Sequence, residues 1–130
     1  MFKISPIQSI NEQIDVASKC NSTYKSGAFA YVMRDSDSGA LMGFSQFEIN
    51  SKGGILLDLK PIPNLDDYEA MFILGRATMN FIDMCGKHTC YAKKDAGDEK
   101  LLRAIGFKSE KDDLLFCDMK GMFDGNCSSH

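Results

Sequence analysis

The sequence predicts an α/β protein built on a mixed sheet of six or seven strands, with helices on both faces of the sheet. The first observation is an apolar run at residues 55–59, which only Asp58 interrupts and which is typical of a buried strand. The run ends at Pro61 and Pro63, and a helical spacing of apolar residues follows at 67–85. Strands joined by tight turns precede this unit, so the sheet is predicted to be antiparallel at first and parallel at its centre.

The beginning of the chain is predicted to hold a strand and a short helix. Residues 2–7 form the strand. Ser9 and Glu12 then have the spacing of a capping box, in which each side chain bonds the backbone of the other residue, so a helix begins here. The helix is predicted to bury a narrow apolar stripe, which consists of Ile10, Ile14 and Ala17.

Three consecutive strands are predicted next, at residues 28–33, 40–49 and 55–59. The polar segments 35–39 and 50–53 join them as tight turns. This arrangement is an antiparallel meander whose last strand is the central strand of the sheet.

A helix and a further strand follow the central strand. The helix is predicted to begin at Asp66 or Asp67, either of which can cap it, and to end at Gly86. A strand at 88–93 comes next and should run parallel to the central strand, because a helix crosses over between the two. The buried face of the helix is predicted to consist of Tyr68, Met71, Phe72, Gly75, Met79 and Ile82.

The chain closes with a short helix and two more strands. Asp98 lies in the first turn of a helix at 98–105, where its charge suits the helix dipole, and Gly106 ends the helix. A strand that starts at Phe107 then turns back into a last strand at 114–119.

Length and composition indicate one domain of an ordinary globular protein. Of the 130 residues 44% are hydrophobic and 25% charged, and we expect a single domain over residues 1–122 and a tail at 123–130. The net charge of −3 is scattered along the chain, so no nucleic acid and no membrane is expected as a partner. The five cysteines are irregularly spaced and no signal peptide is recognisable, so a reduced, cytoplasmic protein is expected.

Asp58 is the candidate catalytic residue. A carboxylate in an apolar strand must be paired, lose its hydration or face a cleft. The alternation of the strand places Asp58 on the same side as Lys60, which is therefore a candidate partner. The pattern leaves two interpretations open, a working base and a structural ion pair.

Cys85, His88 and Cys90 are soft metal-ligand types that lie within six residues of one another. A structural zinc site needs a fourth ligand, usually from a second close pair, and the remaining cysteine and histidine residues are isolated. Core cysteines are common, so no metal is expected here. Cys85 and His88 are also not expected to be a nucleophile and its base, because closeness in sequence is not catalytic geometry.

The order of the elements and the closing helix, which reads LLRAIGF at residues 101–107, resemble the GCN5-related N-acetyltransferase family. The segment is similar to the closing helix signature of that family, which ends in Leu or Ile, Gly and Phe. The resemblance extends from Phe2 to about Met122, although the second N-terminal helix of the family is shortened or missing. It implies the acyl-CoA N-acyltransferase type of fold.

The resemblance also implies acetyl-CoA as the co-substrate, held by the central strand and the helix that follows it. Leu57 and Leu59 would be the cofactor-binding residues and would offer backbone groups to the pantetheine. Asp58 would be the catalytic residue that accepts the proton of the amine.

The phosphate loop of the family does not carry over to this sequence. The Arg position becomes Asn64, and the two glycine positions become Asp67 and Glu69. Glycine is needed there because its missing side chain lets backbone N–H groups approach a phosphate. Asp66, Asp67 and Glu69 instead place three carboxylates at the positive end of the helix, where they repel a pyrophosphate.

The closing helix also departs from the family pattern. Leu102 stands where the family often has a tyrosine that protonates the leaving thiolate. Asp95 stands where the family usually has an asparagine after its fifth strand. Leucine cannot donate a proton. The resemblance implies a GNAT-like N-acetyltransferase that transfers an acyl group to a small-molecule or peptide amine, with a degenerate CoA site and weak or lost activity. The alternative is a non-catalytic module of the same fold that binds a ligand or forms a homodimer.

Overall fold

The structure is a computed structural model and describes residues 1–123. The predicted tail at 123–130, apart from its first residue, lies outside the described residues. The ten helices and strands, in chain order, are β1 (Phe2–Pro6), α1 (Ile10–Lys19), β2 (Phe29–Asp35), β3 (Leu41–Asn50), β4 (Gly53–Pro61), α2 (Tyr68–Met84), β5 (Thr89–Ala92), α3 (Glu99–Ile105), β6 (Ser109–Lys111) and β7 (Leu114–Asp118).

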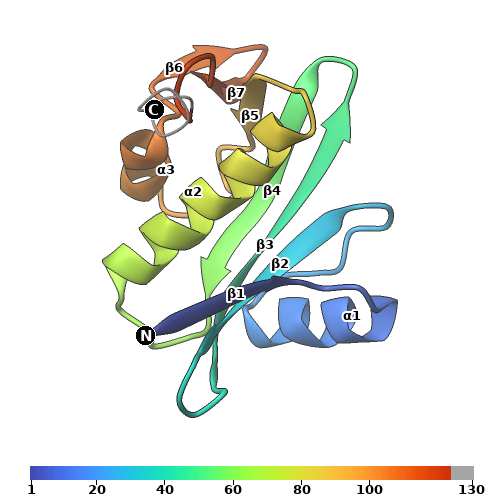
Figure 1. The fold of residues 1–130 in the computed structure, drawn as a ribbon, viewed down its shortest axis with the longest axis vertical. Helices are drawn as coiled ribbons and strands as arrows, with labels where there is room; N and C mark the ends of the chain where they lie inside the picture. The colour runs from blue at the N-terminus through green and yellow to red at the C-terminus, as the bar shows by residue number, and fades with distance from the viewer. Residues whose placement is uncertain (124–130) are drawn as a thin grey trace, which may run out of the picture.

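The strands form one mixed sheet of seven strands in the order β1-β2-β3-β4-β5-β7-β6. Figure 1 shows the two long strands β3 and β4 running through its middle. The pairing of β4 with β5 is parallel, and the other five pairings are antiparallel. The predicted meander and the predicted parallel pairing at the centre are both confirmed. The parallel pairing follows from α2, which carries the chain across the sheet between β4 and β5.

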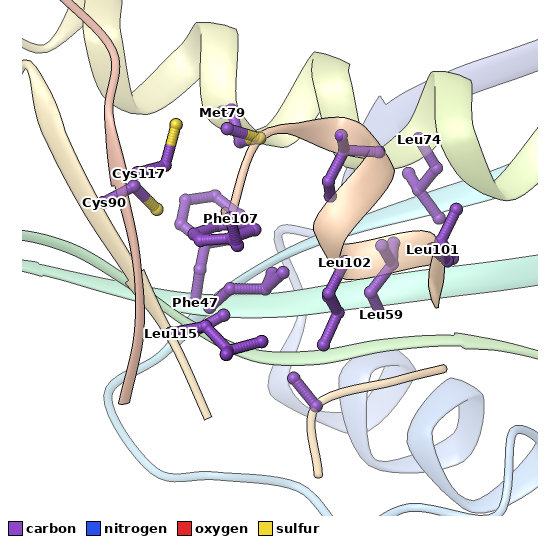
Figure 2. Packing of buried hydrophobic residues seen from close by; sticks show 14 of the residues in the cluster. Phe47, Leu59, Leu74, Met79, Cys90, Leu101, Leu102, Phe107, Leu115 and Cys117 are labelled. Carbon is purple, nitrogen blue, oxygen red and sulfur yellow. The ribbon is translucent and has the colours of Figure 1, made fainter. Parts of the chain in front are cut away.

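The helices lie on both faces of the sheet (Figure 1). α2 and α3 cover one face and bury the larger core, in which Phe47, Leu59 and Phe107 are at most 1% exposed (Figure 2). α1 covers the other face over β2 and β3, where a smaller cluster includes Val16 and Phe44. β4 contributes Leu56 and Leu59 to the larger core, whereas the smaller cluster includes no residue of β4.

The apolar face of α1 differs from the predicted one. Ser9 caps the helix as expected, since its hydroxyl accepts the N–H of Glu12 at 3.3 Å. Ile10 and Ile14, however, are 61% and 46% exposed. Ala17 is buried as predicted, and the helix buries Gln13 and Val16 in place of the two isoleucines. The prediction was wrong because it assumed that only apolar residues are buried, whereas the amide of Gln13 has a hydrogen-bond partner inside the protein.

The buried face of α2 also differs in part. Asp67 caps the helix, and Met71, Gly75, Met79 and Ile82 are buried as predicted. Tyr68 is 54% exposed and Phe72 is only partly buried, and three residues outside the predicted set are buried in addition. These additional buried residues are Ala70, Leu74 and Thr78.

Thr78 can lie in this core because its hydroxyl is hydrogen-bonded to the Ser45 hydroxyl at 2.8 Å and donates to the Leu74 carbonyl.

Among residues 1–123, no helix is both long and apolar enough to span a membrane.

Candidate functional site

A bulge in β4 turns Asp58 away from the apolar core. Phe47 of β3 pairs with Leu56 and Gln46 pairs with Asp58, so Leu57 is an extra residue without a partner in β3. Leu56 and Leu59 both belong to the core under α2. Asp58 is directed to the opposite face of the sheet, where it is 2% exposed.

The carboxylate of Asp58 is held by donors from three parts of the chain. Its Oδ2 accepts hydrogen bonds from the Lys25 ammonium at 2.6 Å and from the Gln46 amide at 2.8 Å. Its Oδ1 lies 3.6 Å from the Lys60 ammonium, the predicted partner, and accepts no hydrogen bond from any residue that the structure describes. Oδ2 is thus fully used, and Oδ1 keeps free acceptor capacity.

Gln46 joins Asp58 to α1 and to the loop that follows it. The Gln46 Oε1 accepts hydrogen bonds from the Gln13 amide at 2.9 Å and from the backbone N–H of Lys25 at 3.1 Å. Its Nε2 donates to the carbonyl of Thr23 at 2.9 Å and to Asp58. The four bonds satisfy the whole side-chain amide, so the loop between α1 and β2 is fastened to the centre of the sheet.

Sequence reasoning missed both Lys25 and Gln46. Lys25 lies 33 residues before its partner, and a contact at that separation leaves no local pattern. Gln46 did carry a signal in the sequence, since it is a polar residue between Phe44 and Phe47 in a predicted strand, and the structure buries it wholly. A buried amide needs partners, just as the carboxylate of Asp58 does.

A polar cavity of about 370 Å³ opens beside Asp58. We call it the Asp58 cavity. Its volume lies within the range of small-ligand sites. It is lined by Asn21, Ser22, Thr23, Lys25, Leu57, Asp58, Lys60, Lys93 and Asp95.

The Asp58 cavity continues into a groove along the end of β4. A second cavity of about 460 Å³ shares Asn21, Lys60 and Asp95 with it. A third cavity, of about 180 Å³, shares Leu59 and Asp98 with the second and reaches the start of α2. We call the second and third cavities together the β4 groove.

The β4 groove is acidic. Asp66, Asp67, Asp95 and Asp98 line it, and Lys60 is its one lysine among the described residues. Two of the carboxylates act as helix caps: Asp67 accepts the N–H of Ala70 at 3.0 Å, and Asp98 accepts the N–H of Leu101 at 3.1 Å. The positive ends of α2 and α3 are therefore already occupied by the chain's own carboxylates.

A turn after β5 fills the gap where β4 and β5 separate. The N–H of Lys93 still donates to the Leu56 carbonyl of β4, at 3.0 Å. The chain then turns, and the N–H of Ala96 closes the turn by a bond to the Lys93 carbonyl. The Ala96 carbonyl in turn accepts the N–H of Leu59 at 2.7 Å. Gly97 then lies so close that a Cβ there would be 2.5 Å from the Leu59 carbonyl oxygen. The backbone N–H of Leu59, a predicted donor to the pantetheine, is thus bonded within the protein. Leu57, the other predicted cofactor-binding residue, lines the Asp58 cavity.

The other candidate residues do not form a site. Cys90 is wholly buried in the core, whereas Cys85 is exposed, and the His88 ring is paired with Asp83 at 2.6 Å. Burial raises the pKa of the Cys90 thiol far above its usual range, so the thiol is inert. No group of three or more His, Cys, Asp or Glu side chains that could hold a metal ion occurs within the described part of the chain.

Leu102 lies in the core and not at the groove. It is fully buried and packs in the same cluster as Leu59, as Figure 2 shows. Its position on α3 therefore contributes to packing and supplies no polar group.

Comparison with known proteins adds one finding. No protein-family model matches the sequence, and no curated protein sequence matches it either. Among solved structures, the PaiA N-acetyltransferase from Thermoplasma acidophilum, in complex with coenzyme A, is similar with a TM-score of 0.66. The similarity covers 89% of this chain and 96% of that chain at 14% sequence identity. The chain has the GNAT fold. The predicted order of helices and strands, on which the resemblance to this fold was based, is therefore confirmed from β1 to β7.

Proposed function

We propose that this protein is a member of the GCN5-related N-acetyltransferase family, with N-acyl transfer to an amine as its reaction and weak or lost use of acetyl-CoA. The observation that carries the proposal is the position of the Asp58 cavity. It lies where β4 and β5 separate and contains a buried carboxylate, one oxygen of which pairs only loosely with Lys60 at 3.6 Å and accepts no hydrogen bond from the described residues. The PaiA neighbour is an N-acetyltransferase and holds coenzyme A, which supports the class of reaction.

Within this proposal Asp58 accepts the proton of the amine. Lys25 and Gln46 hold Oδ2 by hydrogen bonds, which leaves Oδ1 directed at the amine. A base must lie within hydrogen-bond reach of the proton that it takes, and Oδ1 is the oxygen of Asp58 that is left to accept one. The competing interpretation, a structural ion pair, is supported by the same two hydrogen bonds.

Acetyl-CoA does not fit the β4 groove as described. Its diphosphate would meet four carboxylates and one lysine, and at each helix start one N–H, that of Ala70 or Leu101, is already bonded to Asp67 or Asp98. Its pantetheine would need the Leu59 N–H, which is bonded to Ala96. The two obstacles are separable, because pantetheine carries no phosphate.

The test is a thermal melt with acetyl-CoA and, separately, with acetyl-pantetheine, both at millimolar concentration. Ligand at about a hundred times its Kd adds ~2.7 kcal/mol to the free energy of unfolding, which raises Tm by on the order of 5 to 15 °C. A shift with acetyl-pantetheine alone would mean that the carboxylates exclude the diphosphate. Asp67→Gly combined with Glu69→Gly should then restore a shift with acetyl-CoA.

A result with no shift for either compound, in the wild type and in the double variant, would contradict the acyltransferase proposal. The matched control is Asp15→Gly combined with Glu12→Gly in α1, which removes the same charge from residues that do not line the groove. This control should leave the response to both compounds unchanged.

A second candidate function is a non-catalytic module that binds a ligand or a second copy of the chain. The bond from the Leu59 N–H to Ala96 and the close contact of Gly97 favour it, because they occupy the gap between β4 and β5 with the protein's own backbone. Light scattering at two protein concentrations would detect a homodimer. A monomer at both concentrations would leave ligand binding as the role of the module.

A further inference from the structure

The Asp58 cavity carries charges of both signs in a defined arrangement. Three lysines and two aspartates line it, so one positive charge is in excess. Lys25 and Asp58 form the tight pair, at 2.6 Å, and neutralise one another. Lys60, Lys93 and Asp95 remain to interact with whatever enters the cavity.

The two remaining lysines are held loosely. The Lys60 ammonium lies 3.6 Å from Asp58, and the Lys93 ammonium lies 3.9 Å from Asp95, which is 81% exposed. Neither ammonium donates a hydrogen bond to another side chain or carbonyl in residues 1–123. Two ammonium groups with free donors on one cavity are suited to bind a carboxylate.

The free Oδ1 of Asp58 gives the same cavity an acceptor for a cation. It belongs to a side chain that is 3% exposed, and its partner oxygen Oδ2 is fixed by Lys25 and Gln46. A protonated amine could therefore donate to Oδ1 while its own carboxylate lies between Lys60 and Lys93. The positive end of such a ligand would meet Asp58, and its negative end would meet the two lysines.

We propose that the Asp58 cavity binds a zwitterion, an amine that also carries a carboxylate, with the amine on Asp58 and the carboxylate on Lys60 and Lys93. This inference deepens the proposed function, since it names an amino-acid type of acceptor for the reaction. The cavity of about 370 Å³ has room for a small molecule of this class. Binding does not depend on an acyl donor, so it can be measured without one.

The experiment is an NMR titration of the protein with three zwitterions of increasing length, namely glycine, 4-aminobutyrate and 6-aminohexanoate. Each is compared with the amine and the carboxylate of the same chain length. At least one zwitterion should bind about tenfold more tightly than either of its singly charged analogues, because hydrogen bonds to charged groups are made at both ends. If no zwitterion binds more tightly than its analogues, the proposal is wrong.

Variants locate the site. Lys60→Met and Lys93→Met should each weaken the zwitterion by about tenfold or more, because each removes a charged donor and keeps the aliphatic chain. Lys3→Met, at an exposed lysine of β1, is the control and should bind as the wild type does. Equal affinities in all three variants would place binding elsewhere and overturn the inference.

Asp58→Asn tests the amine end. It should bring the affinity for the zwitterion down to that of the carboxylate analogue, and circular dichroism shows whether it has folded. If it does not fold, the comparison of ligands on the wild type still decides. Zwitterion binding without any response to acetyl-CoA or acetyl-pantetheine would keep this inference and reject the acyltransferase proposal.

Discussion

At the scale of single residues, the buried carboxylate of Asp58 joins several parts of the candidate site. A buried charge is costly unless it is paired and hydrogen-bonded, and Asp58 has both a lysine and an amide as partners. The same partners hold the backbone of the α1–β2 loop, through Lys25 N–H and the Thr23 carbonyl. The shape of the cavity wall therefore depends on the charge at its base.

Lys25→Met is predicted to lower the free energy of unfolding by about 1 to 3 kcal/mol, as expected for a buried carboxylate that loses a charged donor. The value lies below that for a fully buried pair because the Lys25 side chain is 28% exposed. Urea unfolding measures it. Lys19→Met, which breaks the exposed ion pair with Asp15, is the control and should cost less than about 0.5 kcal/mol. Equal costs for the two variants would mean that the Asp58 pair does not stabilise the loop.

At the scale of elements, the local patterns predicted the type and order of the helices and strands. Caps were predicted well, because Ser9 and Asp67 act on their own helix within three residues. Faces were predicted less well. Ile10 and Ile14 are exposed, because the face of α1 that packs on the sheet carries Gln13, whose amide donates a hydrogen bond to Gln46 of β3.

The turn after β5 is the element that could not be predicted. A helix was expected to begin at residue 98, and α3 begins at Glu99, so the ranges agree. The bond between Leu59 and Ala96 depends on the path of the chain between two elements, which no local periodicity records. The sequence shows this turn only through Gly97, where a side chain would collide with the Leu59 carbonyl.

Gly97→Ala is predicted to move this turn away from β4. The added Cβ would lie 2.5 Å from the Leu59 carbonyl oxygen, which is backbone and cannot rotate away. The bond from Leu59 N–H to Ala96 should therefore break, with a loss of about 1 to 3 kcal/mol in the free energy of unfolding. Hydrogen exchange of the Leu59 amide should become faster, and the affinity for acetyl-pantetheine should rise if the turn is what excludes it.

Asp95→Ala is the control for Gly97→Ala. It changes an exposed side chain of the same turn without adding a contact, so the free energy of unfolding should change by less than about 0.5 kcal/mol. Unchanged exchange of the Leu59 amide in Gly97→Ala would mean that the turn tolerates a side chain there. The obstacle to pantetheine would then have to lie elsewhere.

At the scale of the whole molecule, the sequence predicted the mixed sheet and the parallel centre because both follow from the order of elements. Part of the candidate site was predicted. Asp58 was singled out because a charge in an apolar strand is conspicuous, whereas Lys25 and Lys93 line the same cavity only through the fold. Residues that meet across long stretches of chain need the structure.

Thiol reactivity tests whether the sheet and its helices open as one unit. Cys85 is exposed, whereas Cys20, Cys90 and Cys117 are at most 3% exposed and lie in both cores. Burial raises the pKa of the Cys20 and Cys117 thiols to about 11, and that of Cys90 further. At pH 8 these three thiols are protonated and shielded, so they should react only when the protein opens.

The measurement uses Cys127→Ser, because Cys127 lies outside the described residues, and a disulfide reagent such as DTNB at pH 8. One thiol, Cys85, should react quickly, and the other three should follow together at the rate of global unfolding, with all four accessible in urea. Cys90 and Cys117 are paired across β5 and β7, and Cys20, at the C-terminal cap of α1, belongs to the cluster on the opposite face. Earlier reaction of Cys20 alone would mean that α1 and the loop fastened by Gln46 open separately from the sheet. The wall of the Asp58 cavity would then be a mobile element, and a common rate would instead make it part of one cooperative fold.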